Sequence, residues 1–263
     1  MSYYPERIIC LTEETTELLY LLGQEDRIVG ISGFTKRPKQ ARQEKPIVSA
    51  FVDANIEKIL NLKPDLVVGF SDIQSDIAKQ LIQKGINVWI NNQRSIAEIK
   101  SFIVQMGSLV GSYDESIALV EKFDSKVAKI KKTTDHWLKK PRIYFEEWDD
   151  PIISGIAWVS ELIELAGGKD IFKKQSHNSL AKDRIISNPK TIIELQPDII
   201  LVSWCGKKFK KDKITSREEW DKINAIKNDY VFEIKSEIIL QPGPASLFDG
   251  LDILHKTFVK YKS

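Results

Sequence analysis

The chain has 263 residues, of which 42% are hydrophobic and 29% charged, and its formal net charge is +2. This composition is that of an ordinary globular protein, and the length suits one large α/β domain or two smaller lobes. The small net charge, and the lack of a basic stripe with interleaved aromatic residues, exclude nucleic-acid binding as the expected function.

The N-terminal segment MSYYPERIICLTEETTELL predicts no export signal, because it lacks a basic start, a long apolar core and a small-residue cleavage site. No run reaches the ~18 apolar residues of a membrane span, so no membrane insertion is expected. We therefore expect a cytoplasmic protein. Cys10 and Cys205 lie far apart beside strand-like residues, which favours reduced thiols over a disulfide bridge.

Two segments of the chain open in the same way. RIICLTEETTELLYLLG predicts a strand, a polar loop and a helix whose N-cap is Thr12. RIYFEEWDDPIISGIAWVSELIELAGG repeats this order with a longer loop between strand and helix. Both predicted helices end at glycine, Gly23 in the first segment and Gly167 with Gly168 in the second, as helices often do.

A second pair of segments strengthens the case for a duplication. Residues 55–68 read NIEKILNLKPDLVV and residues 188–201 read NPKTIIELQPDIIL, with a constant offset of 133 positions. Each predicts a short amphipathic helix, a Pro-Asp turn and a strand that is apolar throughout. Such continuous apolar strands are typical of parallel sheets covered on both faces.

Residues 112–140 separate the two halves and predict one long helix. Ile117, Val120, Phe123, Val127 and Ile130 recur at helical spacing, and neither Gly nor Pro interrupts the run. We predict a helix of ~25 residues that links an N-terminal lobe, residues 1–111, to a C-terminal lobe, residues 141–263. The expected fold is α/β, with two Rossmann-like lobes containing parallel sheets.

In this order, the segments resemble the helical-backbone (class III) periplasmic substrate-binding proteins, and the vitamin B12-binding branch most of all. DRIVGISGFTKRP and ELAGGKDIF add to the resemblance, which spans nearly the whole chain. It implies a ligand cleft between the lobes, lined by loops at the carboxyl ends of the strands, as in open α/β sheets generally. It also implies a monomer that binds a small molecule and has no cofactor of its own beyond a bound corrinoid or metal chelate.

Carried over to this chain, the resemblance assigns ligand contacts to both lobes. In the first lobe these are Thr12, Glu13, Phe34, Phe51 and Phe70. In the second lobe they are Glu146, Glu147, Trp148, Asp149, Trp158, Trp204, Cys205 and Lys207. Arg184 and Gln241 are further candidates, which rest on their own segments and not on the resemblance. Aromatic walls suit a flat macrocycle or planar chelate, because each ring buries ~150–250 Å² of surface.

The segment YFEEWDDP leaves several interpretations open. Its carboxylates could form a solvated turn, contact a ligand beside Trp148, or bind a hard metal ion. A glycosidase-like pair fits less well, because neighbouring residues of an extended strand point to opposite faces. We interpret the segment as the rim of the cleft. For Arg184 two interpretations are open. Its guanidinium could donate two hydrogen bonds to an anionic group of the ligand, or it could form a salt bridge within the lobe.

The segment SWCGKKFKKDK is the basic counterpart. Lys207 and its neighbours could meet an anionic ligand group, pair with the acids of YFEEWDDP, or form an ordinary basic surface loop. Cys205 as a nucleophile lacks a well-placed histidine, and as a soft metal ligand it remains an alternative. Gln241 lies in the proline-rich turn of IILQPGPASLF, before a helix.

Transporter-linked members of the family dock on a permease through an acidic residue on an exposed helix of each lobe. Here Asp76 in SDIQSDIAKQL is a near match, whereas the corresponding CGKKFKKDKITSREEW of the second lobe is basic. An ABC permease is therefore a candidate partner. We nevertheless expect a protein that keeps the fold and the ligand cleft of the family but acts inside the cell.

The resulting hypothesis is non-catalytic binding of a corrinoid or a related planar metal chelate. One alternative is a cytosolic enzyme that uses Glu146, Glu147 or Asp149 as acid and base, with Lys207 as electrostatic partner. Another is a module whose cleft binds a second protein and no small ligand.

Overall fold

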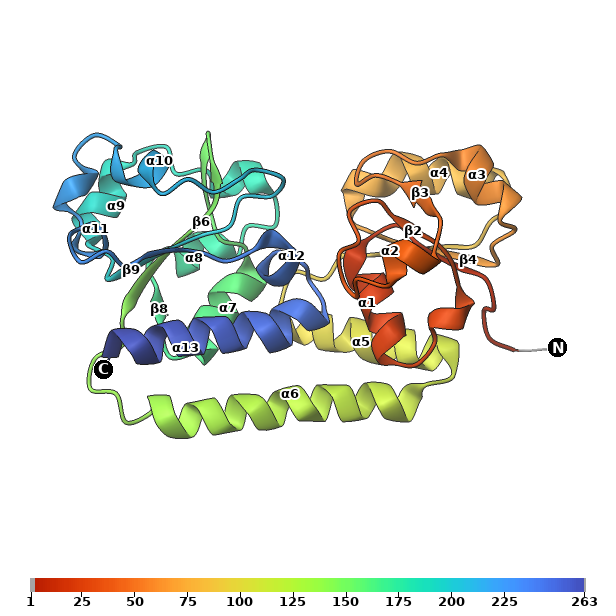
Figure 1. Ribbon diagram of the computed structural model, residues 1–263, viewed down its shortest axis with the longest axis horizontal. Coiled ribbons are helices and arrows are strands. Elements are labelled where there is room, and N and C mark those ends of the chain that lie inside the picture. The colour runs from red at the N-terminus through yellow and green to blue at the C-terminus, as the bar shows by residue number, and fades with distance from the viewer. Residues whose placement is uncertain (1–2, 263) are drawn as a thin grey trace. The chain divides into compact units, whose positions relative to one another are not determined.

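The computed structural model describes residues 3–262 of the chain, which divides into two compact units (Figure 1). The first lobe comprises Met1–Gln93 with Ala97–Lys122, and the second comprises Arg94–Ile96 with Phe123–Ser263. The dividing point at residue 122 falls inside the long helix that the sequence predicts as a link. Each lobe has its own sheet and is described by itself.

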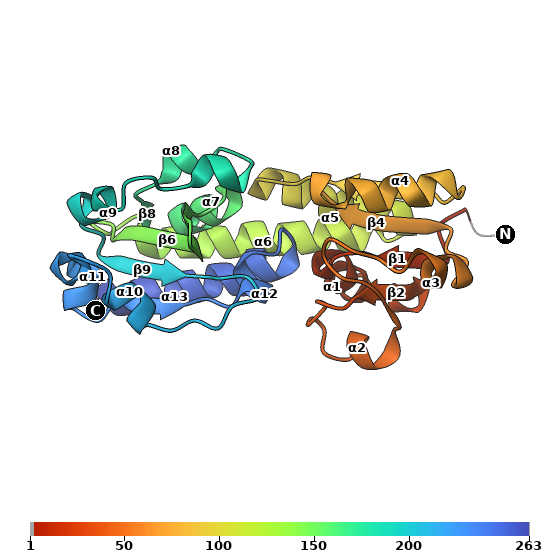
Figure 2. The ribbon, with the colours of Figure 1, turned by 90° about the horizontal axis from the view of Figure 1, so that it is seen from above.

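The first lobe is built on a five-stranded parallel sheet of order β3-β2-β1-β4-β5. Figure 2 shows β1 between β2 and β4. The strands are β1 Ile8–Cys10, β2 Ile28–Ser32, β3 Ile47–Ser49, β4 Leu66–Phe70 and β5 Val88–Asn91. The helices are α1 Glu13–Leu21, α2 Ala41–Glu44, α3 Ile56–Asn61, α4 Ser75–Gln83 and α5 Ile96–Val110, with short 3-10 turns η1 Glu25–Arg27 and η2 Asp72–Gln74. Both β1 and β4 are buried along their whole length, as their apolar sequences predict.

The second lobe contains a mixed sheet of order β10-β9-β6-β7, and β8 also pairs with β6. The strands are β6 Arg142–Asp149, β7 Ile152–Ser154, β8 Lys169–Asp170, β9 Ile199–Val202 and β10 Val231–Glu233. All pairs are parallel except β6 with β7, which form an antiparallel hairpin. The predicted parallel sheets are therefore confirmed, and the β6–β7 hairpin is an antiparallel addition, made where a short Asp-Pro connection folds the chain back.

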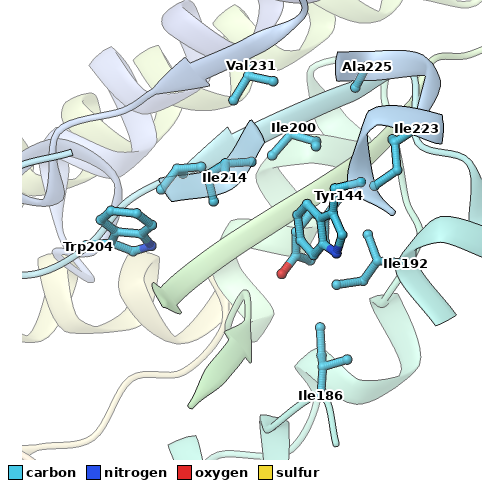
Figure 3. Close-up of a cluster of buried hydrophobic side chains, with 11 residues drawn as sticks. Tyr144, Ile186, Ile192, Ile200, Trp204, Ile214, Ile223, Ala225 and Val231 are labelled. Carbon is cyan, nitrogen blue, oxygen red and sulfur yellow. The ribbon is translucent and has the colours of Figure 1, made fainter. Parts of the chain in front are cut away.

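Helical segments surround this second sheet and close its core. They are α7 Ala157–Leu165, α8 Lys173–Ser176, η3 Ala181–Arg184, α9 Lys190–Leu195, α10 Asp212–Thr215, η4 Trp220–Lys222, α11 Asn224–Lys227, α12 Ser236–Ile239, the π-helical η5 Ser246–Gly250 and α13 Leu251–Lys262. Figure 3 shows one buried cluster of the core, in which Tyr144 and Ile200 of neighbouring strands pack with Ile192, Ile223 and Val231. The predicted α/β class with two lobes is confirmed.

The 133-residue repeat places equivalent residues at equivalent points of the two sheets. Leu66 pairs with Ile8 at the start of β1, and Ile199, its counterpart, pairs with Ile143 of β6. The residue before each Pro-Asp turn has a left-handed backbone, with φ of 47° at Lys63 and 42° at Gln196. The two lobes therefore share a helix–turn–strand unit in conformation as well as in sequence.

The aspartate of each Pro-Asp turn binds the chain that enters the first strand of its lobe. Asp65 accepts hydrogen bonds from the backbone N–H groups of Glu6 (2.7 Å) and Arg7 (3.0 Å). Asp198 accepts one from the N–H of Arg142 at 2.8 Å. Because the backbone N–H groups of Asp65 and Asp198 in turn donate to the Arg7 and Arg142 carbonyls, each aspartate sets the register of two neighbouring strands.

The linking helix α6 spans Tyr113–Thr134, so it is shorter than the predicted range of 112–140. Asp114 and Glu115 lie in its first turn, and Lys131 and Lys132 lie in its last, as the helix dipole favours. In the second lobe its C-terminal half packs against α13, which lies alongside it in Figure 1. Lys126 Nζ lies 2.5 Å from Asp252 of α13. Within the described residues, every helix is too short or too polar to cross a membrane.

We predict that Asp198→Ala lowers the free energy of unfolding by about 1–3 kcal/mol, since it leaves the N–H of Arg142 without its acceptor. Urea unfolding of the purified protein measures the loss. The control is Glu194→Ala on the exposed side of α9, expected to change stability by less than about 0.5 kcal/mol. Equal losses in the two variants would contradict the role assigned to Asp198.

Candidate functional site

The carboxyl ends of β1, β2, β3 and β4 lie at one edge of the first-lobe sheet, because these strands are parallel. We refer to the loops that leave this edge as the first-lobe face. Phe34 follows β2 and Phe51 follows β3, and their side chains are 50% and 39% exposed. Val52 and Ile73 of the same loops are exposed as well. Sequence reasoning missed these two, because an isolated aliphatic residue in a loop carries no signal of its own.

Two other predicted first-lobe contacts are buried. Phe70 is the last residue of β4 and is only 6% exposed. Thr12 is the N-cap residue of α1, as predicted, but its hydroxyl makes no bond to the helix backbone. It donates instead to Glu14 Oε1 at 2.6 Å. Glu13 is half-buried at the start of the same helix.

Glu14 is a buried carboxyl group at this edge of the first lobe. Burial raises its pKa from 4.5 to about 7, the negative charge of Glu17 adds to the rise, and the Thr12 hydrogen bond opposes it. The protonated form is therefore favoured in the folded protein. Between pH 4.5 and 7 the folded state holds a proton that the unfolded state has lost, so stability falls as the pH rises.

We predict that Glu14→Gln removes this dependence. Relative to wild type, the variant should gain on the order of 3 kcal/mol in unfolding free energy between pH 4.5 and pH 8. Urea unfolding at a series of pH values gives the measurement, with Glu57→Gln on exposed α3 as the matched control. Parallel pH curves for wild type and Glu14→Gln would refute the buried neutral acid.

In the second lobe, YFEEWDDP forms the end of β6 and the turn into β7, and its first acid points inward. Glu146 is completely buried. Its carboxylate accepts two hydrogen bonds from the guanidinium of Arg217, at 2.6 and 2.8 Å. It also accepts the hydroxyl of Tyr144 at 2.8 Å and the indole N–H of Trp204 at 3.2 Å. The bonds from Arg217 and Trp204 tie β6 to the chain that follows β9, whereas the bond from Tyr144 lies within β6.

The contacts around Glu146 go with a raised pKa at two neighbouring side chains, Tyr144 and Arg217. Burial raises the pKa of Tyr144 well above its ordinary value, and the neighbouring Glu146 charge adds to the rise. Burial works against the charge of Arg217, but the bonds to Glu146 outweigh it and raise the Arg217 pKa. The Arg217 guanidinium also lies 4.5 Å from the ring centroid of Trp220. Arg217 therefore keeps its positive charge beside Glu146, its ion-pair partner.

Glu147, on the opposite face of the strand, forms a second bidentate pair. Its two oxygens accept hydrogen bonds from Arg184 at 2.6 and 2.9 Å. Arg184 is only 2% exposed and also donates to the carbonyl of Ser154 in β7 at 2.5 Å. Of the two alternatives for Arg184, the structure shows the salt bridge within the lobe.

Asp149 and Trp148 form the outer part of this edge, together with the loop after β9. Lys207 Nζ lies 2.5 Å and Lys213 Nζ 3.2 Å from the Asp149 carboxylate. Burial works to raise the Asp149 pKa, but the two lysines outweigh it and hold the pKa below its ordinary value. The Trp148 indole donates to the carbonyl of Asp150 at 2.9 Å, and Lys207 Nζ lies 4.0 Å from its ring centroid. We call the half-buried Trp148 and the exposed Lys207 together the second-lobe rim.

The remaining predicted ligand contacts differ in how far they are exposed to solvent. Trp158 is 3% exposed and its indole N–H donates to the carbonyl of Ile239. Trp204 is 4% exposed at the end of the Figure 3 cluster, whereas Cys205 beside it is exposed. Gln241 is half-buried after α12. Trp158 and Trp204 therefore have roles in the interior of the lobe.

The pairing of the acids bears on the enzyme alternative. Glu146, Glu147 and Asp149 each form an ion pair with at least one cationic side chain. A general acid or base must be within reach of the group that exchanges the proton, whereas the oxygens of these carboxylates are occupied by cationic partners of the same lobe. Among residues 3–262, no three His, Cys, Asp or Glu side chains come together in a way that could hold a metal ion. The arrangement thus suits a rigid edge for binding better than proton transfer.

A hollow in the first lobe is lined by other residues. It has a volume of about 550 Å³ and is open to solvent. Its lining comes from η2, α4 and β5 and includes Asp72, Lys79 and Ile90. None of the predicted ligand contacts lines it.

The sequence matches the model of the family described as periplasmic binding protein over residues 8–238. The chain belongs to this family. The resemblance inferred from the repeats and the long helix is confirmed. Membership makes this chain a ligand-binding protein of a non-enzymatic family, which agrees with the paired state of its carboxylates.

Relatives match along nearly the whole chain. An uncharacterized ABC transporter substrate-binding lipoprotein, YvrC of Bacillus subtilis, is 28% identical over 95% of this chain and 79% of its own length. The vitamin B12-binding protein of Vibrio cholerae is 26% identical over 92% of this chain and 85% of its own length. The crystal structure of a possible iron-binding, periplasmic solute-binding protein from Staphylococcus epidermidis is 26% identical and superposes with a TM-score of 0.81, covering 96% of this chain and 98% of that chain.

The predicted cytoplasmic location is wrong. The family and the relatives are periplasmic binding proteins or lipoproteins, which points to a location outside the cytoplasm. The prediction failed because it took the first residues of the sequence as evidence about export.

We predict that Glu146→Gln destabilises the protein by about 3 kcal/mol, because the half-buried Arg217 is left without its counter-charge. The double variant Glu146→Leu/Arg217→Met should recover much of the loss, since it removes both charges. Urea unfolding compares these variants with Glu218→Gln, an exposed neighbour. A single-variant loss below about 0.5 kcal/mol would contradict the structural role of Glu146.

Proposed function

We propose that this chain binds a corrinoid or a related planar metal chelate outside the cytoplasm, without catalysis. The observation that carries the proposal is the first-lobe face, where Phe34 and Phe51 expose their rings at the carboxyl edge of a parallel sheet. Ligands of open α/β sheets bind at this edge. The vitamin B12-binding protein of Vibrio cholerae, 26% identical, supports the corrinoid as the first ligand to test.

The apolar character of the first-lobe face suits a flat ligand with a large hydrophobic surface. Phe34, Phe51, Val52 and Ile73 follow three different strands, yet all leave the same edge of the sheet. Exposed apolar side chains gathered in this way mark binding surfaces. A macrocycle that covers these side chains removes their apolar area from water, which stabilises the complex by ~25 cal/mol per Å² before the costs of association.

The second-lobe rim supplies a contact of a different kind. The Trp148 ring is held by its indole bond to Asp150, and the ammonium of Lys207 covers one side. A ligand with peripheral carboxylate or amide oxygens can accept a hydrogen bond from Lys207 while its plane packs on Trp148. Trp148 and Lys207 are therefore proposed as ligand contacts, together with Cys205, which lies two positions before Lys207, and Gln241, which follows α12.

An ABC permease is the proposed protein partner. YvrC, 28% identical, is named as an ABC transporter substrate-binding lipoprotein. In the first lobe, Asp76 is exposed on α4 and is available for contact with a permease.

We predict saturable binding of cyanocobalamin and hydroxocobalamin with micromolar or lower Kd, measured by isothermal titration calorimetry. Trp148→Ala and Phe51→Ala should each weaken binding about tenfold, because each removes a ring that the ligand covers. The matched control is Trp137→Phe. Trp137 follows the linking helix and stacks on His255, so its substitution should leave the affinity unchanged.

Haem and a ferric catecholate are titrated in parallel with the corrinoids. Tighter binding of either one would keep the planar or chelate class and replace the corrinoid as ligand. If none of the compounds binds to the wild-type protein, the proposed ligand class is wrong. If they bind but Phe51→Ala and Trp148→Ala are indistinguishable from Trp137→Phe, the proposed contact residues are wrong.

A further inference from the structure

Gln74 is a completely buried residue that joins three loops of the first-lobe face. It lies at the end of η2, just after β4. Its Oε1 accepts the backbone N–H of Phe70 at 2.9 Å. Its Nε2 donates to the carbonyls of Phe51 at 2.9 Å and Leu11 at 3.2 Å. Phe70 is the last residue of β4, whereas Phe51 and Leu11 follow β3 and β1, so one amide links three strand ends.

The surrounding backbone is shaped to admit this amide. A Cβ atom at Gly69 would lie 2.6 Å from Gln74 Oε1, so any larger residue in this strand position would displace the side chain. Ser71 is the N-cap residue of η2 and has a φ of 59°, and its hydroxyl accepts the N–H of Ile73. The N–H of Gln74 then donates to the carbonyl of Ser71. The turn thereby directs Gln74 back under the loops.

Only a primary amide satisfies all three partners at once. It offers one acceptor oxygen and two donor hydrogens, whereas an ionised carboxylate can only accept and a thioether barely does either. Asparagine is one carbon shorter. The bonding pattern therefore requires glutamine at this position. Without it, the carbonyls of Leu11 and Phe51 would lose a hydrogen-bond donor, which would destabilise the fold.

We propose that Gln74 is a positioning residue that holds the Phe51 loop in the conformation that receives the ligand. The inference rests on the proposed function, in which Phe51 contacts the ligand. Apart from Gln74, backbone hydrogen bonds hold this loop at its base, from Ala50 N–H to the Asp53 carbonyl and from Asn55 N–H to the Val48 carbonyl. A loop already fixed in its bound conformation loses less conformational freedom on binding, and this gain appears in the affinity.

The test combines amide hydrogen exchange with ligand affinity. In the ligand-free protein, Gln74→Met should raise the exchange rate of residues 50–54 about tenfold, while peptides from β6 and β9 keep their wild-type protection. The same variant should weaken cyanocobalamin binding about tenfold. Gln80→Met is the matched control, because the Gln80 side chain is exposed on α4 and donates to the carbonyl of Asp76 within the same helix.

A double-variant cycle separates positioning from general stability. If Gln74 acts through Phe51, then Gln74→Met should have little further effect on affinity in the Phe51→Ala background. Gly69→Ala provides a second route, since its added methyl group pushes the Gln74 amide aside without removing it. It replaces Gln74→Met in the cycle if that variant does not fold.

The outcomes are distinct. Unchanged exchange at residues 50–54 overturns the proposal, and so does faster exchange with wild-type affinity. An affinity loss that is as large in the Phe51→Ala background also overturns it, because Gln74 then acts elsewhere. If the wild-type protein binds none of the compounds tested, the proposed function fails, and the exchange data alone decide whether Gln74 holds the loop.

Discussion

The buried ion pair between Glu146 and Arg217 is the interaction on which the binding edge of the second lobe depends. It unites the end of β6, the segment after β9 and the turn before η4, with Tyr144 and Trp204 completing the carboxylate's hydrogen bonds. A buried charge is tolerated only when it is fully paired and hydrogen-bonded. The geometry of the strand ends is therefore set by the need to satisfy one carboxylate.

Two further acids of this edge, Glu147 and Asp149, are also paired with cationic side chains, closer to the surface. Glu147 binds the buried Arg184, and Asp149 binds Lys207 and Lys213 nearer the surface. A segment that is strongly acidic in sequence becomes electrically compensated in the fold. What remains accessible is the Trp148 ring and its covering ammonium, a surface suited to a planar ligand with polar edges. The two lobes thus offer different chemistry, an apolar face in the first and a charged aromatic rim in the second.

The repeated Pro-Asp unit shows how a duplicated scaffold can support this difference. Asp65 and Asp198 both anchor the entry to the first strand of their lobe. The scaffold contacts lie at the amino ends of the strands, whereas the contacts that differ lie at the carboxyl ends. Because the two ends are separated along the sheet, loops at the binding edge can change without disturbing the register that the aspartates maintain.

Sequence by itself determined the features that depend on local pattern. Apolar runs predicted β4 and β9, the helical spacing predicted α6, and the matched order of segments predicted the α/β lobes and the family. Tertiary structure alone decided which charges meet, because Arg217 lies 71 positions from Glu146 and Arg184 lies 37 from Glu147. It also decided the place of Gln74, whose partners at Leu11 and Phe51 are 63 and 23 positions away. Periodicity reports burial within one element, whereas a hydrogen-bond partner is chosen by the packing of several elements at once.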